Sequence, residues 1–513
     1  MRITRGVAAM SVVALLLVAV EVAYLTKIFY FGQFKILAYK HAPGLFLPEK
    51  DFHHTPLLGC SIPKENNIHT HFFHVEFTSQ EIPTKQTDAG FSGGGGMASY
   101  GNHVLLIDKW GALYQIIDDS ATRLNIQTPD TGLDLFLQRS DVSSQTGDFK
   151  FLDVLVIGND LFVSYVKWND ENSCYTLTVD ATEVFVIEEE ISPANGTWRN
   201  VFQSSPCLPA TNMTASLSLH VSGGRMAQLN QTDFLLTVGD FATDNLFPQG
   251  SDPQRVNNDY GKVIRINAAA GTKEIYSLGH RNPQGITIDR DGRIWAVEHG
   301  PRGGDELNLI EFGGNYGWPK ATLGTSYDTT PLAMSTDFAR HSYETEPVFS
   351  WIPSRGVSNL IQIQGFDPAW DGDLLVGTMG MTRLYRLRTR KDRVLFSEPI
   401  CIGRRVRYLH QHTDGMIYVW TDDDVLYTIT GPDKTEQNTT AQTIKQLSAC
   451  LECHGIDGGT SGPALSQISS KDPEYISAYL KDPQRVNPQA QMPALSLTDN
   501  DIEEIITVLQ QVR

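Results

Sequence analysis

Between about residues 55 and 432 the chain has no sustained helical periodicity, and this constrains its fold more than any other feature. Short runs of β-branched and aromatic residues alternate there with turns rich in Gly, Asp, Asn and Pro, at a spacing of roughly 10 residues. Short strands and turns over such a length are typical of a β-sandwich, a barrel or a propeller. We therefore expect a mainly β fold over residues 55–432.

A weak internal repeat favours the propeller among these three. A turn followed by an apolar strand recurs at residues 110–114 (WGALY), 159–162 (NDLF), 291–295 (DGRIW) and 414–418 (DGMIY). One such hairpin in each blade is how a propeller repeats in sequence. The polar segment that follows, residues 433–442, is predicted to be a linker.

The motif CLECH at residues 450–454 is the attachment signature of a c-type haem. The thiols of Cys450 and Cys453 would bond the haem vinyl groups, and His454 would be the proximal ligand of the iron. Met492 is the only Met or His after His454, so we expect it to be the second axial ligand, which raises the haem potential. A zinc site or a redox CxxC is the alternative, but no second Cys pair follows.

Two helical segments are expected on either side of Met492, at residues 475–480 and 499–512. Thr498 or Asp499 would cap the second helix, whose apolar stripe consists of Ile502, Ile505, Ile506 and Leu509. Together with the haem motif, this pattern resembles a small class I cytochrome c. We place this all-α domain at residues 443–513.

The N-terminal segment, residues 1–30, is predicted to be a transmembrane helix that anchors the chain. Arg2 and Arg5 precede an apolar stretch from Gly6 to Leu25, interrupted by Glu21. An apolar helix of about 20 residues spans the roughly 30 Å of a bilayer core. A cleaved secretory signal is the alternative, although no clear small-x-small cleavage site follows. Either reading exports the remainder, and we expect it on the periplasmic side of the inner membrane.

The charge of the chain excludes one class of partner. There are 41 basic against 59 acidic residues, a formal net charge of −18. A nucleic-acid binder needs clustered Lys and Arg to neutralise phosphates. We therefore expect no nucleic-acid partner.

Residues 279–319 read GHRNPQGITIDRDGRIWAVEHGPRGGDELNLIEFGGNYGWP. This stretch closely resembles the soluble glucose and aldose-sugar dehydrogenases that depend on pyrroloquinoline quinone (PQQ), which are six-bladed propellers. The resemblance extends more weakly over about residues 90–430. It implies that PQQ lies on one end of the propeller with Ca²⁺ at its quinone edge, and that the substrate is a sugar or another small alcohol.

The resemblance also implies roles for individual residues. His220 matches the catalytic base, Asp240 the acid that orients it, and Arg281 the arginine beside the quinone. The residues that match cofactor contacts are Asn282, Arg405 and Arg407. These types suit the chemistry, because the three PQQ carboxylates need planar bidentate donors and a hydride transfer needs a base for the hydroxyl proton.

Four further positions match calcium-associated residues of that family. Gly300 and Pro301 match the pair whose main-chain carbonyls hold Ca²⁺, and Glu306 and Tyr316 match further calcium-associated positions. Calcium prefers oxygen ligands, and main-chain carbonyls are suitable ones. Bound Ca²⁺ would polarise the quinone as a Lewis acid.

Two departures from the family pattern keep an alternative open. One extra residue separates His220 from the Gly-Gly-Arg that follows it, and Gly380 stands where glucose-type members place a cofactor-binding Lys. The second departure weakens any claim for glucose specificity. The alternative function is a propeller without PQQ that serves as a binding or assembly subunit carrying an electron-transfer haem.

The four remaining cysteines are expected to form disulfides, because their number is even and an exported chain meets an oxidising compartment. We pair Cys174 with Cys207 within one outer blade, and Cys60 with Cys401 so that the first strand is stapled to the last blade. With the resemblance, these patterns predict an anchored periplasmic quinoprotein dehydrogenase. It would pass electrons from a sugar or other alcohol through its own haem to a downstream cytochrome or terminal oxidase.

Overall fold

The computed structural model describes most of the propeller region and part of the C-terminal region. The described residues are 60, 67–70, 74–84, 94–117, 120–138, 149–187, 189–209, 219–242, 252–327, 329–332, 334–431, 454, 463–490, 492 and 497–509. The predicted anchor at residues 1–30, the predicted linker at 433–442, and Cys450 and Cys453 lie outside these residues. No described helix has the length and apolar character needed to cross a membrane.

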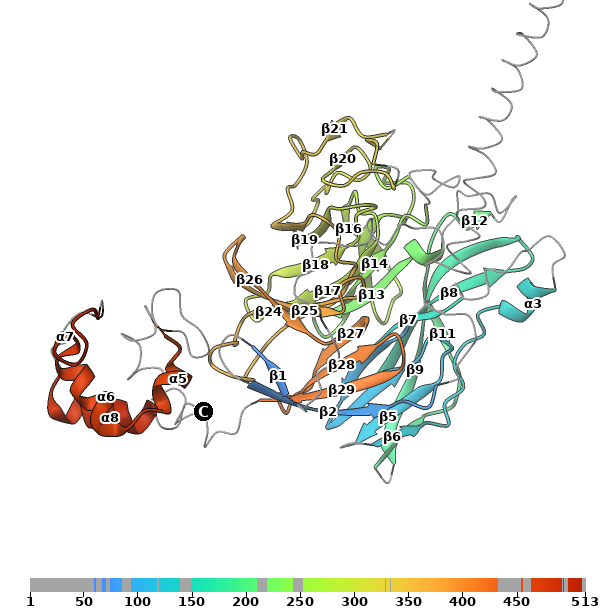
Figure 1. Cartoon of the computed structure of the whole chain (residues 1–513). Coiled ribbons are helices and arrows are strands. Elements are labelled where there is room, and N and C mark those ends of the chain that lie inside the picture. The colour runs from blue at the N-terminus through green and yellow to red at the C-terminus, as the bar shows by residue number, and fades with distance from the viewer. Residues whose placement is uncertain are drawn as a thin grey trace, which may run out of the picture.

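Six antiparallel sheets form the blades of a propeller, which confirms the predicted fold (Figure 1). Blade 1 consists of β3 (Gly96–Tyr100), β4 (His103–Ile107), β5 (Leu113–Ile117) and β6 (Ser120–Arg123). Blade 2 consists of β7 (Phe151–Ile157), β8 (Asp160–Asn169), β9 (Cys174–Ile187) and β10 (Glu190–Pro193), with β11 (Arg199–Gln203) and β12 (Leu208–Pro209) also on β9. Blade 3 consists of β13 (Gly223–Gln228), β14 (Asp233–Val238), β15 (Lys262–Asn267) and β16 (Lys273–Leu278).

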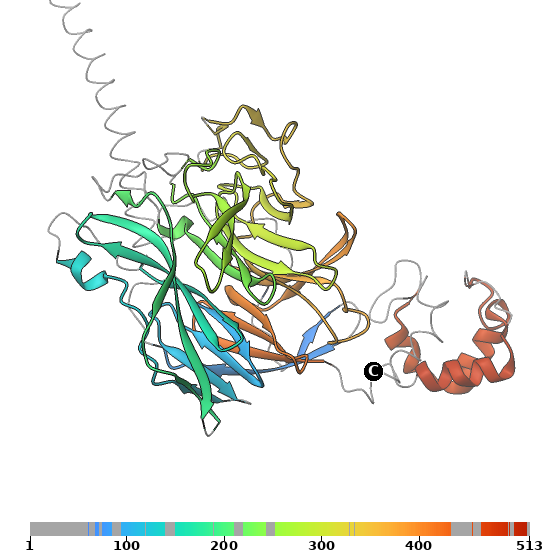
Figure 2. The same ribbon diagram turned by 180° about the vertical axis from the view of Figure 1, so that it is seen from behind.

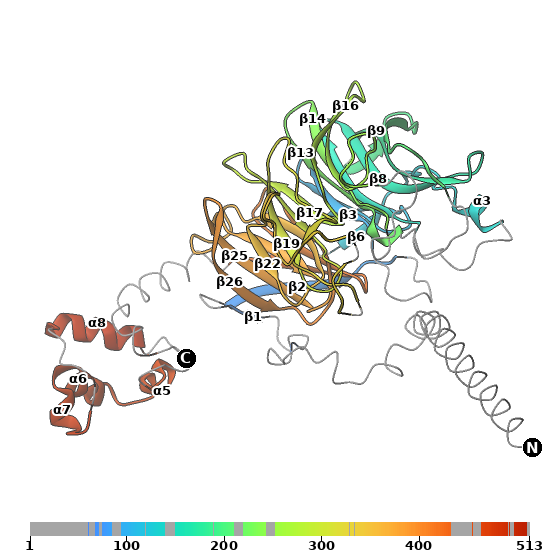
Figure 3. The ribbon, with the colours of Figure 1, turned by 90° about the horizontal axis from the view of Figure 1, so that it is seen from above.

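The other three blades complete the ring (Figures 2 and 3). Blade 4 consists of β17 (Pro283–Ile288), β18 (Ile294–Glu298), β19 (Asp305–Ile310) and β22 (Phe349–Trp351), with a separate parallel pair, β20 (Ala321–Thr322) and β21 (Asp337–Phe338), inserted before β22. Blade 5 consists of β23 (Val357–Gln362), β24 (Leu374–Thr378), β25 (Arg383–Arg390) and β26 (Arg393–Cys401). Blade 6 consists of β27 (Val406–Gln411), β28 (Ile417–Thr421), β29 (Val425–Thr430), β2 (His74–Glu81) and β1 (Asn67–His69).

The ring closes by strand pairing between the two ends of the propeller sequence. Strand β2 pairs antiparallel with β29, in a register that joins Glu76 to Thr430 and Glu81 to Val425. Blade 6 therefore contains strands from both ends. The ring of blades cannot open unless this ladder breaks. Its two strands are separated along the chain by the other five blades, and their pairing leaves neither strand as a free edge on that side.

The repeated turns lie where the propeller interpretation requires them, with one exception. Three of the four, at residues 159–162, 291–295 and 414–418, join the first and second strands of blades 2, 4 and 6. The turn at residues 110–114 instead joins the second and third strands of blade 1. That repeat is therefore one strand out of phase with the others.

Both predicted disulfides are present, but one of them reaches a different blade. Cys174 and Cys207 are joined within blade 2, where Cys174 begins β9. Cys60 is joined to Cys401, which ends β26 of blade 5 rather than belonging to the last blade. The expectation about the blade was wrong because three more strands, β27 to β29, follow Cys401.

The hydrophobic core lies between neighbouring blades. Trp295 and Val297 of blade 4 pack with Val357 and Leu360 of blade 5, and all four are buried. Because both faces of a blade are covered, its middle strands read as nearly continuous apolar runs, such as the fully buried β18 and β28. Such strands show little of the apolar–polar alternation that marks a half-buried strand.

Arg225 of β13 occupies the centre of the ring and is almost completely buried. Its guanidinium donates to the carbonyl oxygens of Gln284 (2.9 Å), Gly95 (2.7 Å) and Leu152 (2.6 Å). The same group lies 4.8 Å from the centre of the Tyr408 ring. One side chain thus joins blades 1, 2, 3, 4 and 6 at the axis.

The described C-terminal helices form a small cluster of their own. They are α5 (Leu465–Ser469), α6 (Pro473–Lys481), α7 (Pro483–Val486) and α8 (Asp499–Leu509); two short segments, α3 (Leu133–Leu137) and η2 (Leu219–Val221), belong to the propeller. The two predicted helices correspond to α6 and α8. Thr498 caps α8 and exchanges hydrogen bonds with Asp501, and Ile502, Ile505 and Leu509 are buried in the cluster as expected.

Candidate active site

The strand register gathers the predicted site residues on one face of the propeller. The first residue of an inner strand pairs with the end of the second strand in several blades: Gly223 with Val238, Pro283 with Glu298, Val357 with Thr378 and Val406 with Thr421. The loops that precede inner strands therefore share one face with the loops that follow second strands. We call this the site face.

Most of the predicted site residues lie on it. His220 precedes β13, Arg281 and Asn282 precede β17, and Arg405 precedes β27, while Arg407 is the second residue of β27. The loops that follow second strands bring the others to the same face: Asp240 after β14, and Gly300 and Pro301 after β18.

Arg281 is 8% exposed and anchored on several sides. Its main-chain N–H donates to Glu298 Oε2 over 2.8 Å, and its guanidinium donates to the His299 carbonyl over 3.1 Å. The guanidinium also lies 5.5 Å from the centre of the Trp318 ring. These contacts fix a positive charge on the site face.

Asp240 lies behind Arg281 and is completely buried. Burial raises its pKa to about 7, although the charge of Arg281 and hydrogen bonds from Ala242 and Trp318 oppose the shift. Trp318 Nε1 donates to one carboxyl oxygen over 2.6 Å and the Ala242 N–H to the other over 2.9 Å. The role of orienting His220 stays a prediction, because these hydrogen bonds join Asp240 to Trp318 and Ala242.

His220 is exposed at the site face in the short helix η2. Asn282 supports that helix from blade 4: its Nδ2 lies 3.5 Å from the His220 carbonyl, and its Oδ1 accepts from the Gly223 N–H over 3.3 Å. Gln284 Nε2 donates to the same Oδ1 over 2.8 Å. Asn282 therefore positions the backbone that carries His220.

Arg405 and Arg407 share one acidic partner. Their Nε atoms donate to the two oxygens of Asp422, over 2.8 Å and 2.6 Å respectively. Burial alone would raise the pKa of Asp422, but the charges and hydrogen bonds of the two arginines, Arg407 above all, hold it below its usual value. Two positive charges against one negative charge leave the group with a net positive charge.

Pattern reasoning missed several basic residues of this face. Lys109, which follows β4, lies within the electrostatic field of Asp422 and Arg407, and Lys150 and Arg355 lie in the loops before β7 and β23. Their positions beside strands could have indicated them, because each flanks an inner or second strand, as Arg281 and Arg405 do. Such positions can be recognised only when the strands have been assigned.

The loop that carries Gly300 and Pro301 is tightly wound. The Gly300 N–H donates to Asp305 Oδ1 over 3.1 Å, and Asp305 Oδ2 accepts from the main-chain N–H groups of Arg355 (2.7 Å) and Gly356 (2.6 Å). Gly304 has a φ of +70°, and a Cβ there would lie 2.6 Å from the next loop's backbone. Asp305 thus fixes the loop of blade 4 to blade 5.

Glu306 and Tyr316 lie in a different, buried polar cluster. Burial, and then the nearby Glu298, raise the pKa of Glu306 well above its usual value, and its carboxyl contacts Asn308 Nδ2 at 3.3 Å. The Tyr316 hydroxyl donates to the Leu309 carbonyl over 2.6 Å, so its phenol is committed to the fold. Within the described ranges, no three His, Cys, Asp or Glu side chains are grouped so that they could hold a metal.

Gly380 is built into the backbone of the site face. Its N–H donates to the Arg355 carbonyl over 3.0 Å, and a Cβ at this position would lie 2.8 Å from that oxygen. A Lys here would require the turn to move. Arg383, a basic residue three positions further along the chain, is buried at the start of β25.

Of the expected haem ligands, His454 and Met492 are among the described residues. His454 Nδ1 lies 2.8 Å from the Pro463 carbonyl oxygen, which assigns the proton to Nδ1 and leaves Nε2 as the ring nitrogen with a lone pair. Met492 is half-buried and packs against the α5, α6 and α8 cluster. Their predicted roles are not tested by these contacts.

Fold and site together define a six-bladed propeller with a basic, histidine-bearing face. Comparison with known proteins agrees. The family model of glucose/sorbosone dehydrogenase matches residues 159–427, more than half of the chain. The chain therefore belongs to the glucose/sorbosone dehydrogenase family.

Two curated relatives are similar over part of their length. The chain is 33% identical over 223 residues to an uncharacterized protein of Synechocystis sp., covering 39% of this chain and 53% of that protein. It is 30% identical over 243 residues to the aldose sugar dehydrogenase YliI of Escherichia coli, covering 44% of this chain and 62% of that protein. The matched region thus spans between half and two thirds of these relatives.

A third relative and a solved structure complete the comparison. The quinoprotein glucose dehydrogenase B of Acinetobacter calcoaceticus is 44% identical over 70 residues, 12% of this chain and 15% of that protein. The crystal structure of the soluble aldose sugar dehydrogenase of Escherichia coli in its apo form aligns with a TM-score of 0.56 at 23% identity, covering 69% of this chain and all of that one. This likeness supports the fold.

Proposed function

We propose that the chain is a PQQ-dependent dehydrogenase that oxidises a sugar or another small alcohol. The observation that carries the proposal is the basic ring on the site face, formed by Arg281, Arg405, Arg407 and Lys109 beside the exposed His220. PQQ is a planar tricarboxylate, and planar guanidinium groups bind carboxylates in a bidentate manner. When bound there, PQQ would supply the two-electron acceptor for oxidation of the substrate alcohol.

The residues present fit such a group. Arg355 Nε and Ser222 Oγ are buried on the site face and make no hydrogen bond within the part of the chain that the structure describes. A buried donor without an acceptor is unfavourable by about 1–3 kcal/mol. A carboxylate placed on this face would satisfy such donors.

The proton of the substrate hydroxyl would go to His220. A neutral imidazole is a suitable base near pH 7, and a positioned base accelerates such a step by about 10²–10⁴-fold. Asn282 holds the backbone of η2, while Arg281 and Arg407 bind and orient the anionic partner of the reaction. Asp240 would orient His220, as the resemblance implies.

Calcium fits two places by the chemistry of their donors. The carbonyls of Gly300 and Pro301 lie on a loop that Asp305 holds rigid, and they would be main-chain ligands of a Ca²⁺ that supplies Lewis-acid polarisation. In the buried cluster, Asn308 Oδ1 and Glu344 Oε2 have no hydrogen-bond partner among the described residues, and Glu306 is adjacent. A cation bound by Glu306 and these two acceptors would favour the ionised carboxylate of Glu306.

We further propose that residues 443–513 are a cytochrome c domain. The proton on His454 Nδ1 supports this, because a haem-ligating His donates from that nitrogen and binds iron through Nε2. Cys450 and Cys453 would bind the haem, Met492 would be the sixth ligand, and what the group supplies is one-electron transfer to a downstream cytochrome or terminal oxidase. Residues 1–30 would anchor this assembly at the periplasmic side of the membrane. Residues 433–442 would join the propeller to the haem domain.

Haem reduction by substrate tests the whole proposal. The full chain, matured with haem and supplied with PQQ and Ca²⁺, should show reduced haem absorbance when an aldose is added, and His220→Ala should slow this by at least about 100-fold. Exposed Arg390→Ala is the matched control and should behave as the wild type. If dithionite reduces the haem but no aldose, alcohol or aldehyde does, the enzyme proposal is wrong.

The close packing of Gly380 favours a second candidate. A propeller that lacks the usual Lys and binds no PQQ would be a binding or assembly subunit around the haem. Equilibrium titration with PQQ distinguishes the two functions. Saturable binding that Arg407→Ala weakens supports the dehydrogenase, and no binding by a folded, haem-containing chain supports the assembly subunit.

A further inference from the structure

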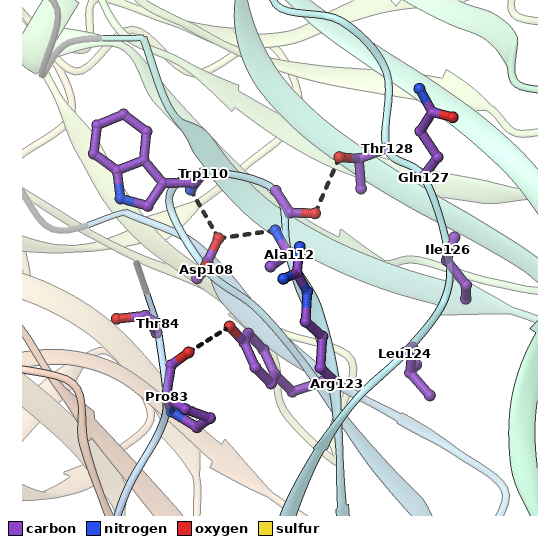
Figure 4. Close-up of a pocket in the computed structure, with 12 residues that line it drawn as sticks. Pro83, Thr84, Asp108, Trp110, Ala112, Arg123, Leu124, Ile126, Gln127 and Thr128 are labelled. Carbon is purple, nitrogen blue, oxygen red and sulfur yellow. Dashed lines mark hydrogen bonds between the residues drawn. The ribbon is translucent and has the colours of Figure 1, made fainter. Parts of the chain in front are cut away.

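A cavity of about 600 Å³ lies between blade 6 and blade 1 (Figure 4). Its walls are the segment after β2, the turn between β4 and β5, and the segment after β6. All three lie at the site face: Glu81 pairs with Val425, Gly96 with Ile107, and Tyr114 with Arg123. The cavity therefore lies on the rim of the face that carries the basic ring.

The lining combines aromatic and polar side chains in the way that sugar sites do. Trp110 supplies aromatic surface, and Asp108, Arg123, Gln127 and Thr128 supply polar groups (Figure 4), while Tyr114 is buried beneath them. Its volume is within the roughly 300–1,000 Å³ of small-molecule sites. One carboxylate and one guanidinium balance each other, so the lining favours a neutral polyol over an anion or a cation.

The polar groups of the cavity are held in place before any ligand arrives. Asp108 Oδ1 accepts from the main-chain N–H groups of Trp110 (2.8 Å) and Ala112 (2.9 Å), which fixes the turn. Tyr114 Oη donates to the Pro83 carbonyl over 3.1 Å, and Thr128 Oγ1 donates to the Gly111 carbonyl over 3.0 Å. The three walls are thus tied to one another.

One acceptor in this cavity wall is unsatisfied. Asp108 is 2% exposed, and its Oδ2 has no hydrogen-bond partner within the described residues. Burial raises the pKa of this carboxyl, although the hydrogen bonds from the Ala112 and Trp110 N–H groups to its other oxygen oppose the shift. A ligand hydroxyl, directly or through a bound water, would supply the missing donor.

Lys109 connects the cavity to the proposed catalytic centre. It lies between Asp108 and Trp110 in the chain, and its ammonium group is 4.9 Å from the centre of the Trp110 ring. The same ammonium lies in the field of Asp422 and Arg407. Lys109 therefore belongs to the basic ring and also contacts Trp110, which lines the cavity.

We propose that this cavity is a second saccharide subsite, which binds a neutral sugar ring of an oligosaccharide whose reacting end lies at the basic ring. This inference rests on the proposed function for the reacting end only. A sugar ring would place its C–H face on the aromatic surface and direct hydroxyls to Asp108, Arg123 and Gln127. The cavity would therefore add contacts to an oligosaccharide that a monosaccharide at the basic ring cannot make.

Equilibrium binding tests the subsite without any turnover. Calorimetric titration of the full chain without PQQ, using maltotriose and cellotriose, should detect saturable binding of at least one of them. Arg123→Ala and Trp110→Ala should each weaken that binding by about tenfold, which is about 1.4 kcal/mol. Arg390→Ala, exposed on blade 5, is the matched control and should bind as the wild type.

Kinetics with the reconstituted enzyme then separate this inference from the proposed function. The ratio of kcat/KM for the bound trisaccharide to that for glucose should fall about tenfold in Arg123→Ala, through KM rather than kcat. No trisaccharide binding to the full chain, or a ratio within twofold of wild type in both variants, overturns the subsite. Trisaccharide binding without any sugar oxidation would instead support the subsite and contradict the proposed dehydrogenase function.

Discussion

Asp240 illustrates what burial does to a single residue of this site. Its carboxyl is fully buried beside Arg281, yet desolvation outweighs that charge and raises the pKa to about 7, against roughly 3.9 for an exposed Asp. Between these two values the folded chain retains a proton that the unfolded chain loses. Stability attributable to this group is therefore highest at acidic pH and is lost as the pH rises from about 4 to about 7.

Asp240→Asn should remove this part of the pH dependence. The free energy of unfolding of the wild type should fall between pH 4 and pH 7 relative to the variant, by up to about 4 kcal/mol. The test is the slope, since the amide also loses the hydrogen bond from Trp318 and so changes the absolute stability. Urea titrations of both proteins at several pH values measure it, and parallel curves would show that Asp240 is ionised in the folded chain throughout.

At the scale of one element, the start of β27 places Arg405 and Arg407 together. Arg405 precedes the strand, the pairing with β28 shifts register between Val406 and Tyr408, and both guanidiniums contact Asp422. A row of this kind on a sheet is often only a solvated face. The burial of Arg407 and the buried shared carboxylate distinguish this pair from that case.

Arg407→Lys should weaken PQQ binding although it keeps the charge. An ammonium group cannot make the two parallel hydrogen bonds of a guanidinium to a carboxylate, so we expect the Kd to rise by about tenfold. Titration of the apo chain with PQQ, followed by fluorescence, measures this change. Arg390→Lys controls for general effects, and an equal Kd in all three proteins would place PQQ away from Arg407.

The Cys60–Cys401 disulfide acts at the scale of elements, because it fixes the segment before β1 to the outer strand of blade 5. It spans 341 residues of sequence. Replacing both cysteines by serine should lower the free energy of unfolding by about 2–4 kcal/mol. The midpoint of urea unfolding measures the loss, with the Cys174→Ser/Cys207→Ser variant for comparison, and an unshifted midpoint would mean that the β2–β29 ladder alone holds the ring closed.

Over the whole molecule, sequence patterns predicted the fold class and those site residues that lie next to one another in the sequence. Turns such as Asp291–Gly292 identified hairpins, and Arg281 and Asn282 lie in one unbroken motif before β17. Lys109, Arg355 and Asp422 could not be found in this way. They come from separate blades, and only strand register, a property of the completed ring, brings them to one face.

The blade count and the position of Cys401 show the same limit. Inner strands buried on both faces lose the alternation by which strands are recognised, so the individual strands could not be counted along the chain. The six blades were implied by family resemblance rather than by periodicity. The same uncertainty placed Cys401 in the last blade when three further strands follow it.

Arg225 gives the molecule-wide test of how the ring is held together. Its guanidinium donates to carbonyls of blades 1, 2 and 4, and it is the positive charge beside Asp153, a buried carboxyl whose pKa desolvation raises to about 6 despite Arg225. Arg225→Met should lower the free energy of unfolding by about 3–5 kcal/mol, because it leaves the carbonyls and a buried charge without their partner.

The deficit should itself depend on pH and on Asp153. Below pH 6 Asp153 takes up a proton and is no longer an unpaired charge, so Arg225→Met should be less damaging at pH 5 than at pH 8. Adding Asp153→Asn should recover about 1–3 kcal/mol at pH 8 as a coupling energy. Urea unfolding of the two single variants and the double variant measures this cycle, with Arg390→Met expected within about 0.5 kcal/mol of wild type. Additive losses, equal at both pH values, would mean that the blades hold together by strand pairing and apolar packing without the charge at the axis.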